Sequence, residues 1–424
     1  MATGIVQQWK TLTSPQRNAF IACFLGWSLD AFDFFVLTYC ISAIATDFHV
    51  GVKDVTEALF WTLVMRPVGA LLFGALAEKI GRRPTLMINI ISFCVFEVAS
   101  GFAPTLHSLL ICRALFGIAM GGEWGVGAAL AFETLPEENR GFFSGLLQEG
   151  YVIGNLLAAS VYGLLFSHLP LAGSGMMTNW RLMFFIGAAP AILVFYIRSK
   201  VDESPAYLAG RAKAVKPTLN LSDVMRYLPN FIFLVLLMTA FTSFSHGTQD
   251  LYPTFLQKNK GFSSGTTGWV SDVGHIGALL GGITFGTLSE RWGRRRCIVI
   301  AALMAIPMIY FWAFTAVPLM VAAGGFLMQF MVQGAWGIIP AHLNELSPAA
   351  VRATFPGLAY QLGNLLSSRN GPLQASMAAK YFKGQLGPVL AITVAVVAIA
   401  VSLLAGFGRE ARGQSMLTTD DVAI

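Results

Sequence analysis

The chain has 424 residues, of which 55% are hydrophobic and 12% are charged, with a mean hydropathy of +0.64. Soluble domains carry roughly 25% charged residues, so this composition excludes an ordinary soluble protein and indicates one that lies in a membrane. The net charge of +6 does not call for nucleic acid as a partner, because the cytoplasmic loops of membrane proteins collect lysine and arginine.

Twelve apolar runs lie between residues 18 and 407, each of about the 20 residues that a helix needs to cross a bilayer. Continuous runs of this length favour helices over barrel strands, because a helix satisfies its backbone hydrogen bonds within the segment. We expect an all-α membrane protein of twelve transmembrane helices in two six-helix, pseudo-symmetric bundles. The expected units are residues 1–198, a cytoplasmic linker at 199–227, and residues 228–424, which end in a short cytoplasmic tail.

Basic residues gather in the segments that share a side with the N-terminus. This asymmetry predicts that both termini are cytoplasmic and that the chain is a multi-pass protein of the inner cell membrane. Nucleotide-binding loops and the motifs of soluble hydrolases are not found. We therefore expect a secondary carrier without a cofactor, and not an enzyme or an ATP-driven pump.

The first span contains two carboxylates, Asp30 and Asp33. Their spacing of three places both on one helix face. An ionisable group inside a membrane costs about 2.5 to 3.5 kcal/mol unless it is paired or hydrated, so such groups indicate function. We interpret the pair as proton-coupling residues, and the alternative is a structural pair that caps a kink or bonds to neighbouring spans.

Charged motifs at the cytoplasmic ends of the spans are repeated half a chain apart. The segments that begin at Gly74 and Gly286 share the pattern Gly-x-x-x-Glu-(Lys/Arg)-x-Gly-Arg-Arg, which indicates that one half is a copy of the other. We predict that these charges form ion pairs between helices that open and close a gate. Reading them as topology anchors explains the arginines but not the glutamates. The predicted gating residues are Glu78, Arg82, Arg83, Glu133, Arg140, Glu290, Arg294, Arg295, Glu345 and Arg352.

The fourth and fifth spans add further polar groups. Glu123 lies in a glycine-rich stretch and has Ala335 as its repeat partner, so we predict a third proton-coupling acid, with an ion pair to Arg113 or another cation as the alternative. Tyr151 and Asn155 follow helical spacing on one face of the fifth span. They are predicted to contact substrate in a water-filled cavity.

The seventh span holds the densest polar insertion, in which His246, Gln249 and Asp250 project from one side of a helix. The pattern predicts substrate binding by His246 and Gln249 and proton coupling by Asp250. A metal site is not expected, because two candidate ligands without a third fall short of a coordination set.

The eleventh span carries Arg369 near the amide of Asn364. A guanidinium group suits two-point recognition of a carboxylate, so both residues are predicted to bind an anionic substrate, with Arg369 as its anchor. The alternative is a permanent ion pair of Arg369 with a buried acid such as Asp250 or Asp33.

Over its whole length the chain resembles the major facilitator superfamily, whose characteristic loop motif is matched at 74–83 and 286–295 with Glu where Asp is commoner. The seventh span is similar to the signature of JEN-type monocarboxylate permeases, with Thr242 in place of its Asn; the matching residues are Ser245, His246, Thr248, Gln249, Asp250 and Thr254. The segments Leu29–Asp33 and Gly121–Gly125 look like the related sialate/proton symporters. The resemblance implies symport of an organic carboxylate with protons.

We therefore predict a proton-coupled symporter of small monocarboxylates, of the lactate or pyruvate type, that works by alternating access and functions as a monomer. Its expected partners are the carboxylate, the proton and the bilayer. The alternatives are a symporter of sialic acid or another organic acid, a nutrient sensor that does not transport, and a channel.

Overall fold

The computed structural model describes residues 2–165, 178–189, 191–212 and 221–413, and the regular secondary structure of these residues is helical. Residues 213–220 of the expected linker and 414–424 of the expected tail lie outside the described residues. Nine helical segments of the described part are long and apolar enough to cross a membrane. Three more segments, which are more polar or interrupted, complete the twelve predicted spans; they are α6 (Arg140–Gln148) with α7 (Gly150–Leu165), α13 (Ser264–Trp292), and α17 (Phe355–Ser367) with α18 (Asn370–Tyr381).

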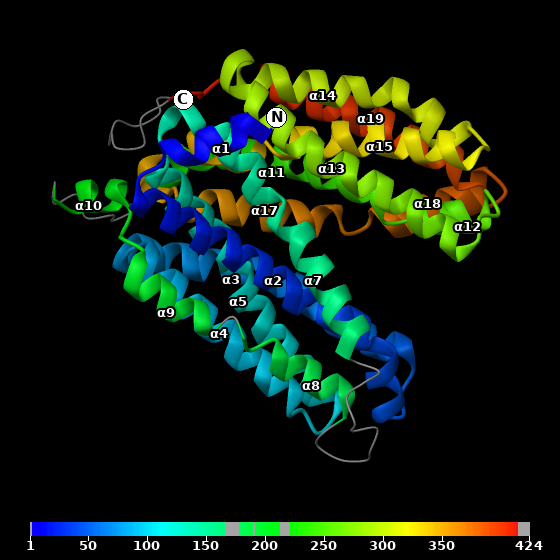
Figure 1. Cartoon of the computed structure of the whole chain (residues 1–424), viewed down its shortest axis with the longest axis horizontal. Helices are drawn as coiled ribbons and strands as arrows, with labels where there is room; N and C mark the ends of the chain where they lie inside the picture. The colour runs from blue at the N-terminus through cyan, green and yellow to red at the C-terminus, as the bar shows by residue number, and fades with distance from the viewer. Residues whose placement is uncertain (1, 166–177, 190, 213–220, 414–424) are drawn as a thin grey trace.

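The first bundle follows the chain from its N-terminus (Figure 1). Its helices are α1 (Ala2–Thr11), α2 (Ser14–Asp47), α3 (Val52–Ile80), α4 (Arg82–Gly101), α5 (Leu106–Thr134), α6 (Arg140–Gln148), α7 (Gly150–Leu165), α8 (Asn179–Ile186) and α9 (Ala191–Lys200), with a 3₁₀ turn at Glu137–Asn139. Its most extensive contacts join α3 to α5 and α2 to α7, and the two helices of each pair run parallel to each other. The short helix α10 (Pro205–Ala212) follows this bundle and belongs to the linker.

The second bundle repeats the arrangement. Its helices are α11 (Leu221–Gln249), α12 (Tyr252–Lys258), α13 (Ser264–Trp292), α14 (Arg294–Ile309), α15 (Pro318–Trp336), α16 (Ile339–Leu346), α17 (Phe355–Ser367), α18 (Asn370–Tyr381) and α19 (Leu386–Phe407), with a π-helical turn at Tyr310–Phe314 and a 3₁₀ turn at Ala349–Val351. The prediction of two pseudo-symmetric helical bundles is confirmed.

The repeated loop motif forms the same tight turn in each bundle. Gly81, between α3 and α4, has a φ of 104°, and Gly293, between α13 and α14, has a φ of 95°. Side chains with a Cβ rarely adopt this conformation, so glycine is required at both positions. The turn brings the arginine that follows each glycine to the start of the next helix.

Several spans are broken in the middle. The span that contains His246 ends as α11 at Gln249 and resumes as α12, where Pro253 occupies the first turn. The eleventh predicted span is likewise divided at Ser368 and Arg369, between α17 and α18. A break frees backbone groups that water or a ligand must satisfy, so broken spans in membrane proteins border protein interior or a water-filled cavity.

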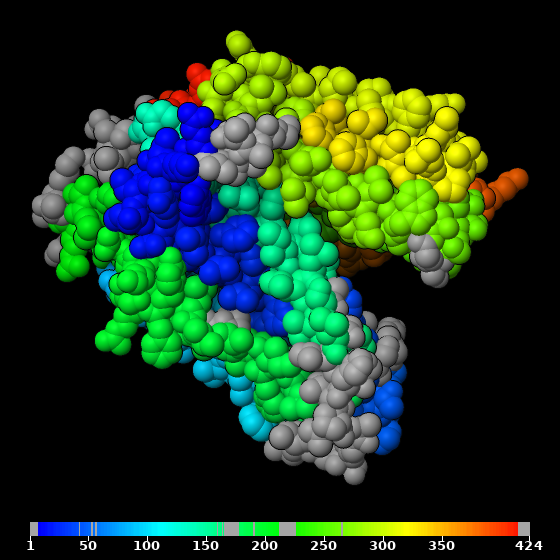
Figure 2. Space-filling view, viewed as in Figure 1, coloured from blue at the N-terminus to red at the C-terminus, as the bar shows by residue number. Residues whose placement is uncertain are grey.

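The two bundles meet at one end and separate at the other. We call the end that carries α1, α10 and the last turn of α19 the terminal face, and there α17 packs on α3 and α5 while α6 packs on α13 (Figure 1). The space-filling view shows a deep cleft between the bundles that opens away from this face (Figure 2). The structure is therefore closed at the terminal face and open at the opposite one.

Glycines allow the closed contact. A Cβ on Gly145 of α6 would lie 2.4 Å from the carbonyl oxygen of Gly282 in α13, and a Cβ on Gly357 of α17 would lie 2.9 Å from the Cα of Gly125 in α5. Both approaches are closer than a Cβ atom tolerates. The bundles can close in this way only because glycine, which has no side-chain carbon, occupies these positions.

We expect a Gly145→Leu, Gly357→Leu double variant to favour the conformation that is open at the terminal face. Overpacking costs about 1–3 kcal/mol and here falls only on the closed contact. Spin labels at Lys79 and Arg291, which are exposed on the two bundles at this face, would report a longer distance. Gly268→Leu is the control, since a Cβ there meets nothing within 4 Å. An unchanged distance in the double variant contradicts the prediction.

Candidate functional site

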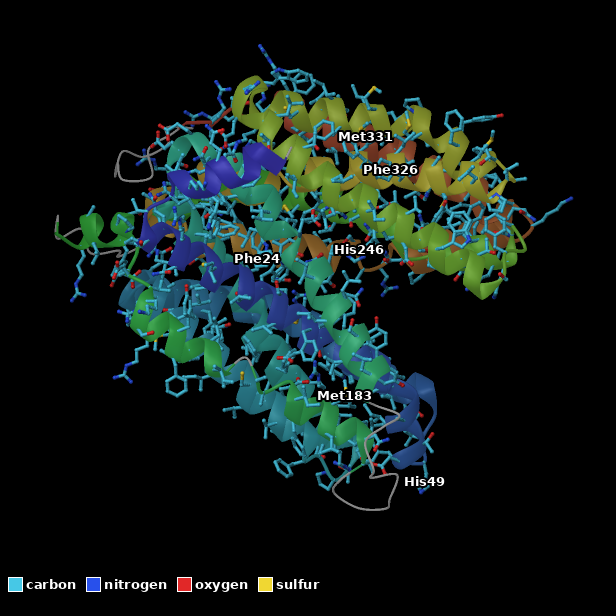
Figure 3. The ribbon with its side chains drawn as sticks, in the orientation of Figure 1. Phe24, His49, Met183, His246, Phe326 and Met331 are labelled. Atoms are coloured by element: carbon cyan, nitrogen blue, oxygen red, sulfur yellow. The ribbon has the colours of Figure 1, made fainter. Side chains whose placement is uncertain are left out.

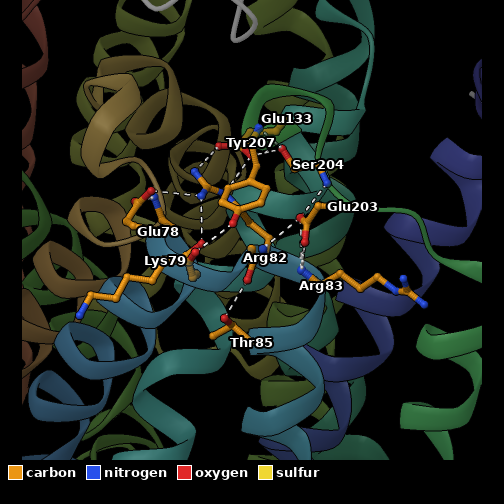
Figure 4. A network of polar contacts seen from close by, with 12 residues as sticks. Glu78, Lys79, Arg82, Arg83, Thr85, Glu133, Glu203, Ser204 and Tyr207 are labelled. Carbon is orange, nitrogen blue, oxygen red and sulfur yellow. Dashed lines mark hydrogen bonds and ion pairs between the residues drawn. The ribbon is translucent and has the colours of Figure 1, made fainter. Parts of the chain in front are cut away.

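Two equivalent networks of charge lie at the terminal face. Arg82 donates hydrogen bonds to Glu133 over 3.1 and 3.0 Å and to Glu78 over 3.1 Å (Figure 4). In the second bundle Arg294 donates to Glu345 over 3.1 and 2.9 Å and to Glu290 over 3.1 Å. These are the glutamates and arginines that the repeat placed in equivalent positions.

Each network also reaches across to the other bundle. Glu78 accepts a hydrogen bond from the backbone N–H of Ala353 over 2.8 Å, and Glu290 accepts one from the backbone N–H of Gly141. These two contacts are related by the same repeat, so the bundles are joined by a symmetric pair of carboxylate-to-amide bonds. Opening of the terminal face must break both.

Two buried arginines face the opposite network. Arg140 of the first bundle lies within electrostatic range of Glu345, and Arg352 of the second lies within range of Glu133. The remaining predicted gating residues make contacts within their own bundles. Arg83 donates to the carbonyl of Arg198, and Arg295 donates to the carbonyl of Ala405 over 3.0 Å. The predicted set thus lies together at one face of the protein, and most of its members bridge helices.

The acids of the first bundle form a buried group. Arg113 is fully buried and pairs with Glu97 over 2.5 Å, so the alternative in which Arg113 pairs with Glu123 is wrong. The carboxylate oxygens of Asp30, Asp33 and Glu123 are buried without a hydrogen-bond partner among the described residues. Buried carboxyl groups without partners are costly when ionised, so these three groups are suited to carry protons.

The polar residues of α11 line the second bundle's side of the cleft. His246 contacts Asp250 over 3.1 Å, and both side chains are more than two-fifths exposed (Figure 3). Gln249 donates to Gln329 of α15 over 2.9 Å, and Gln329 donates to Thr248 over 3.3 Å. The cluster therefore presents an imidazole, a carboxylate and two linked amides from two helices.

The other predicted substrate residues belong to both bundles. Asn155 accepts a hydrogen bond from Tyr39 over 3.1 Å, and the ring of Tyr151 packs against Trp27 at 5.5 Å. Asn364 is half-buried and bonds to Gln361 over 3.4 Å and to His246. Arg369 is exposed at the break between α17 and α18. The alternative of a permanent ion pair between Arg369 and Asp33 is wrong, since neither carboxylate oxygen of Asp33 has a hydrogen-bond partner within the described part of the chain.

Arg66 of α3 is the residue that the sequence analysis missed. Its side chain is 4% exposed, and its Nε and Nη2 atoms are buried without a hydrogen-bond partner among the described residues. The residues within its electrostatic range belong to both bundles; they are Asp30, Glu123, Tyr151, Tyr360 and His246. Arg66 is thus a buried cation at the junction of the two halves.

The signal for Arg66 was present in the sequence. It is the one charged residue between Leu59 and Ala77 of an otherwise apolar run. A guanidinium group there has no route to water unless it lies in a cavity or meets an acid.

A cluster of aromatic rings joins the two bundles. Tyr360 of α17 stacks on Trp124 of α5 at 4.7 Å and contacts Trp336 of α15 at 5.8 Å and Trp27 of α2 at 6.5 Å. The indole N–H groups of Trp27 and Trp124 are buried and lack partners among the described residues. This four-ring cluster contains residues of both bundles and two indole N–H groups that, within the described ranges, are free to donate.

Comparison with known families agrees with this architecture. The Major Facilitator Superfamily model matches residues 23–368, and a second match covers residues 248–414. The chain belongs to the major facilitator superfamily. Membership in this superfamily of transporters confirms the predicted fold class and makes the chain a multi-pass membrane transporter.

Relatives within the superfamily transport different compounds. The chain is 29% identical to the carboxylic acid transporter protein homolog of Saccharomyces cerevisiae over 89% of its own length and 64% of that protein's length. It is 28% identical to the sialic acid transporter NanX of Escherichia coli, with 94% and 96% covered. It is 30% identical to a probable 4-methylmuconolactone transporter of Cupriavidus pinatubonensis, with 85% and 83% covered.

Solved superfamily structures share the fold. The proton:xylose symporter XylE superimposes with a TM-score of 0.74 at 18% identity, covering 95% of this chain and 98% of that one. The human organic anion transporter MFSD10 gives a TM-score of 0.68 at 16% identity, with 92% and 100% covered. At these identities the likeness concerns the fold alone.

Proposed function

We propose that this chain is a proton-coupled symporter of small monocarboxylates, of the lactate or pyruvate type, which works by alternating access. It crosses the inner cell membrane with both termini in the cytoplasm and functions as a monomer without a cofactor. On this assignment the terminal face is cytoplasmic, and the cleft opens outward. The first half of the cycle is therefore capture of substrate from outside.

The observation that supports the proposal most directly is that Arg66 is buried and, among the residues that the structure describes, lacks hydrogen-bond partners for two of its nitrogens. A guanidinium group that is 4% exposed and has two unpartnered nitrogens is unfavourable unless an anion meets it there. Its planar donors fit the two oxygens of a carboxylate. Arg66 therefore takes the place of primary anchor for the substrate, and the exposed Arg369 remains a candidate for its first capture.

The acids near Arg66 would couple binding of the substrate to binding of a proton. Asp30 and Glu123 lie within electrostatic range of Arg66, so in the ionised state they compete with a substrate carboxylate for the same cation. Protonation removes this competition and leaves Arg66 available to the anion. Loss of the proton restores the competition and expels the anion. Binding of the proton and the anion is therefore mutually favourable, as symport requires.

The polar wall opposite Arg66 would hold the rest of the substrate. His246 and Gln249, together with Asn155 and Asn364, offer hydrogen bonds for a hydroxyl or keto oxygen next to the carboxylate. Asp250, paired with His246 and exposed to the cleft, is a further candidate for the coupled proton. Neutralising the anion with a proton lowers the cost of moving the loaded site through the closed state.

A symporter of sialic acid is the second candidate. It is favoured by the amides of Gln249, which bonds to Gln329, and of Gln333, which bonds to Ser245, since these would suit a substrate with many hydroxyl groups, and by the similarity to NanX. Its larger substrate should use these amides more than a monocarboxylate does. Uptake of labelled lactate in the presence of excess sialic acid separates the two candidates.

The test of the proposed function is uptake into proteoliposomes that contain the purified chain. Labelled lactate, pyruvate, acetate and sialic acid are compared under an imposed acid-outside gradient, with a proton-conducting uncoupler as the control. We expect saturable, gradient-driven accumulation of lactate or pyruvate. Accumulation of sialic acid alone supports the second candidate. Binding without uptake indicates a sensor, and uptake that does not saturate indicates a channel.

A further inference from the structure

A cavity lies at the terminal face, outside the cleft. It has a volume of about 490 Å³ and lies between α10 and the ends of α3, α4 and α9. It is an open surface cavity, and its lining residues are Ile80, Arg83, Pro84, Met87, Arg198, Glu203, Tyr207, Leu208 and Arg211. Arg83 belongs to the predicted gating set, but neither the transport cycle nor the gating contacts account for the side chains of Arg198 and Arg211.

The charge of the lining favours an anion. Arg83, Arg198 and Arg211 contribute guanidinium groups, and Glu203 is the one acid among the lining residues. The Glu203 carboxylate already accepts hydrogen bonds from the backbone N–H groups of Arg82, Arg83 and Ser204, over 3.0, 3.2 and 2.8 Å (Figure 4). Burial raises the pKa of Glu203, and these amide bonds oppose the rise. The arginines therefore exceed the acid by two charges.

The apolar part of the lining continues along the membrane-spanning surface. Ile80 and Leu208 at the cavity are 41% and 52% exposed. From Pro84 an exposed stripe runs up α4 through Ile88, Ile91 and Val95, which are 42%, 46% and 55% exposed and recur at helical spacing. The cavity thus joins a basic pocket at the end of the helices to an apolar track along one of them.

We propose that this cavity binds the phosphate headgroup of an anionic phospholipid, whose acyl chains lie along the exposed stripe of α4. Guanidinium groups recognise phosphate oxygens through paired, charge-assisted hydrogen bonds. The apolar track distinguishes a lipid from a free anion, because inorganic phosphate has nothing to place there. Basic pockets beside transmembrane helices bind anionic headgroups for the same reason.

The experiment is native mass spectrometry of the full chain in detergent, titrated with phosphatidylglycerol or with phosphatidylcholine of the same acyl chains. We expect saturable binding of one phosphatidylglycerol that exceeds the binding of phosphatidylcholine. In the Arg198→Gln, Arg211→Gln double variant this binding should weaken roughly 25-fold, since each basic side chain near an anionic lipid contributes about a factor of five.

The control is the Lys10→Gln, Arg291→Gln double variant, which removes the same charge from exposed positions of the same face outside the cavity. It should bind phosphatidylglycerol as the parent does. Equal weakening in both double variants, or equal binding of the two lipids by the parent, overturns the proposal. Displacement of the lipid by millimolar inorganic phosphate also overturns it, because the site would then take a free anion. All four arginine and lysine side chains are on the surface, and size-exclusion profiles verify that the variants are folded.

Discussion

Replacing Arg66 with glutamine is expected to reduce monocarboxylate uptake at least about 30-fold, because losing one member of a buried, hydrogen-bonded charge pair costs about 2–5 kcal/mol. Glutamine keeps the length and some hydrogen bonding of the side chain but removes its charge. Arg66→Lys should be intermediate, since it keeps the charge and loses the planar fork. Initial rates in proteoliposomes, with the amount of inserted protein measured in parallel, give the comparison.

Arg369→Ala is the companion variant, and it tests the anchor that the sequence indicated. If Arg369 alone holds the carboxylate, Arg369→Ala abolishes uptake and Arg66→Gln leaves it near the parent value. If Arg66 is the anchor, Arg66→Gln abolishes both uptake and equilibrium binding of the anion. Binding measured by the fluorescence of the tryptophans in the cluster between the bundles would distinguish loss of binding from loss of movement. Normal uptake by Arg66→Gln would refute the mechanism proposed for it.

Amide replacements of the buried acids should uncouple transport from protons. In the parent chain, a gradient of one pH unit is expected to drive accumulation approaching about tenfold, the ratio that 1.36 kcal/mol per proton allows. In Asp33→Asn or Glu123→Gln, accumulation should fall to about onefold, because an amide at the coupling site cannot release a proton. Exchange of labelled for unlabelled substrate should continue, since it needs no net proton movement.

Asp47→Asn is the matched control for these variants. Asp47 is an acid of the same helix as Asp33, but it pairs with Arg181 near the other end of the span and is partly exposed. It should keep uphill accumulation. Undiminished accumulation in both Asp33→Asn and Glu123→Gln would exclude these residues from coupling and leave Asp30 and Asp250 as the candidates.

The fold was largely predictable from the sequence. Apolar runs of membrane-crossing length gave the spans, and the repeat of Glu78 and Arg82 as Glu290 and Arg294 gave two equivalent bundles. The breaks within spans were not predicted, although the polar run at residues 367–371, followed by Pro372, lies where α17 passes into α18. Only the backbone of the structure locates the interruption at Ser368 and Arg369.

The candidate site was predictable in its residue types more than in its pairings. His246 and Asp250 lie four apart, and local helix geometry suffices to bring them together. Which acid meets Arg113 depends on how α4 and α5 pack, and spacing along one helix holds no information on that. Arg66 was missed for a related reason, since its role comes from neighbours on several other helices.

The closed terminal face is held by two equivalent hydrogen bonds between the bundles. Glu78 holds Ala353, and Glu290 holds Gly141, each carboxylate being fixed at the same time by an arginine of its own bundle. These two hydrogen bonds are related by the pseudo-twofold axis and share no residue. Loss of one therefore leaves the other intact. A change that removes one of these contacts would thus shorten the time that the protein spends closed at the terminal face, without abolishing the closed state.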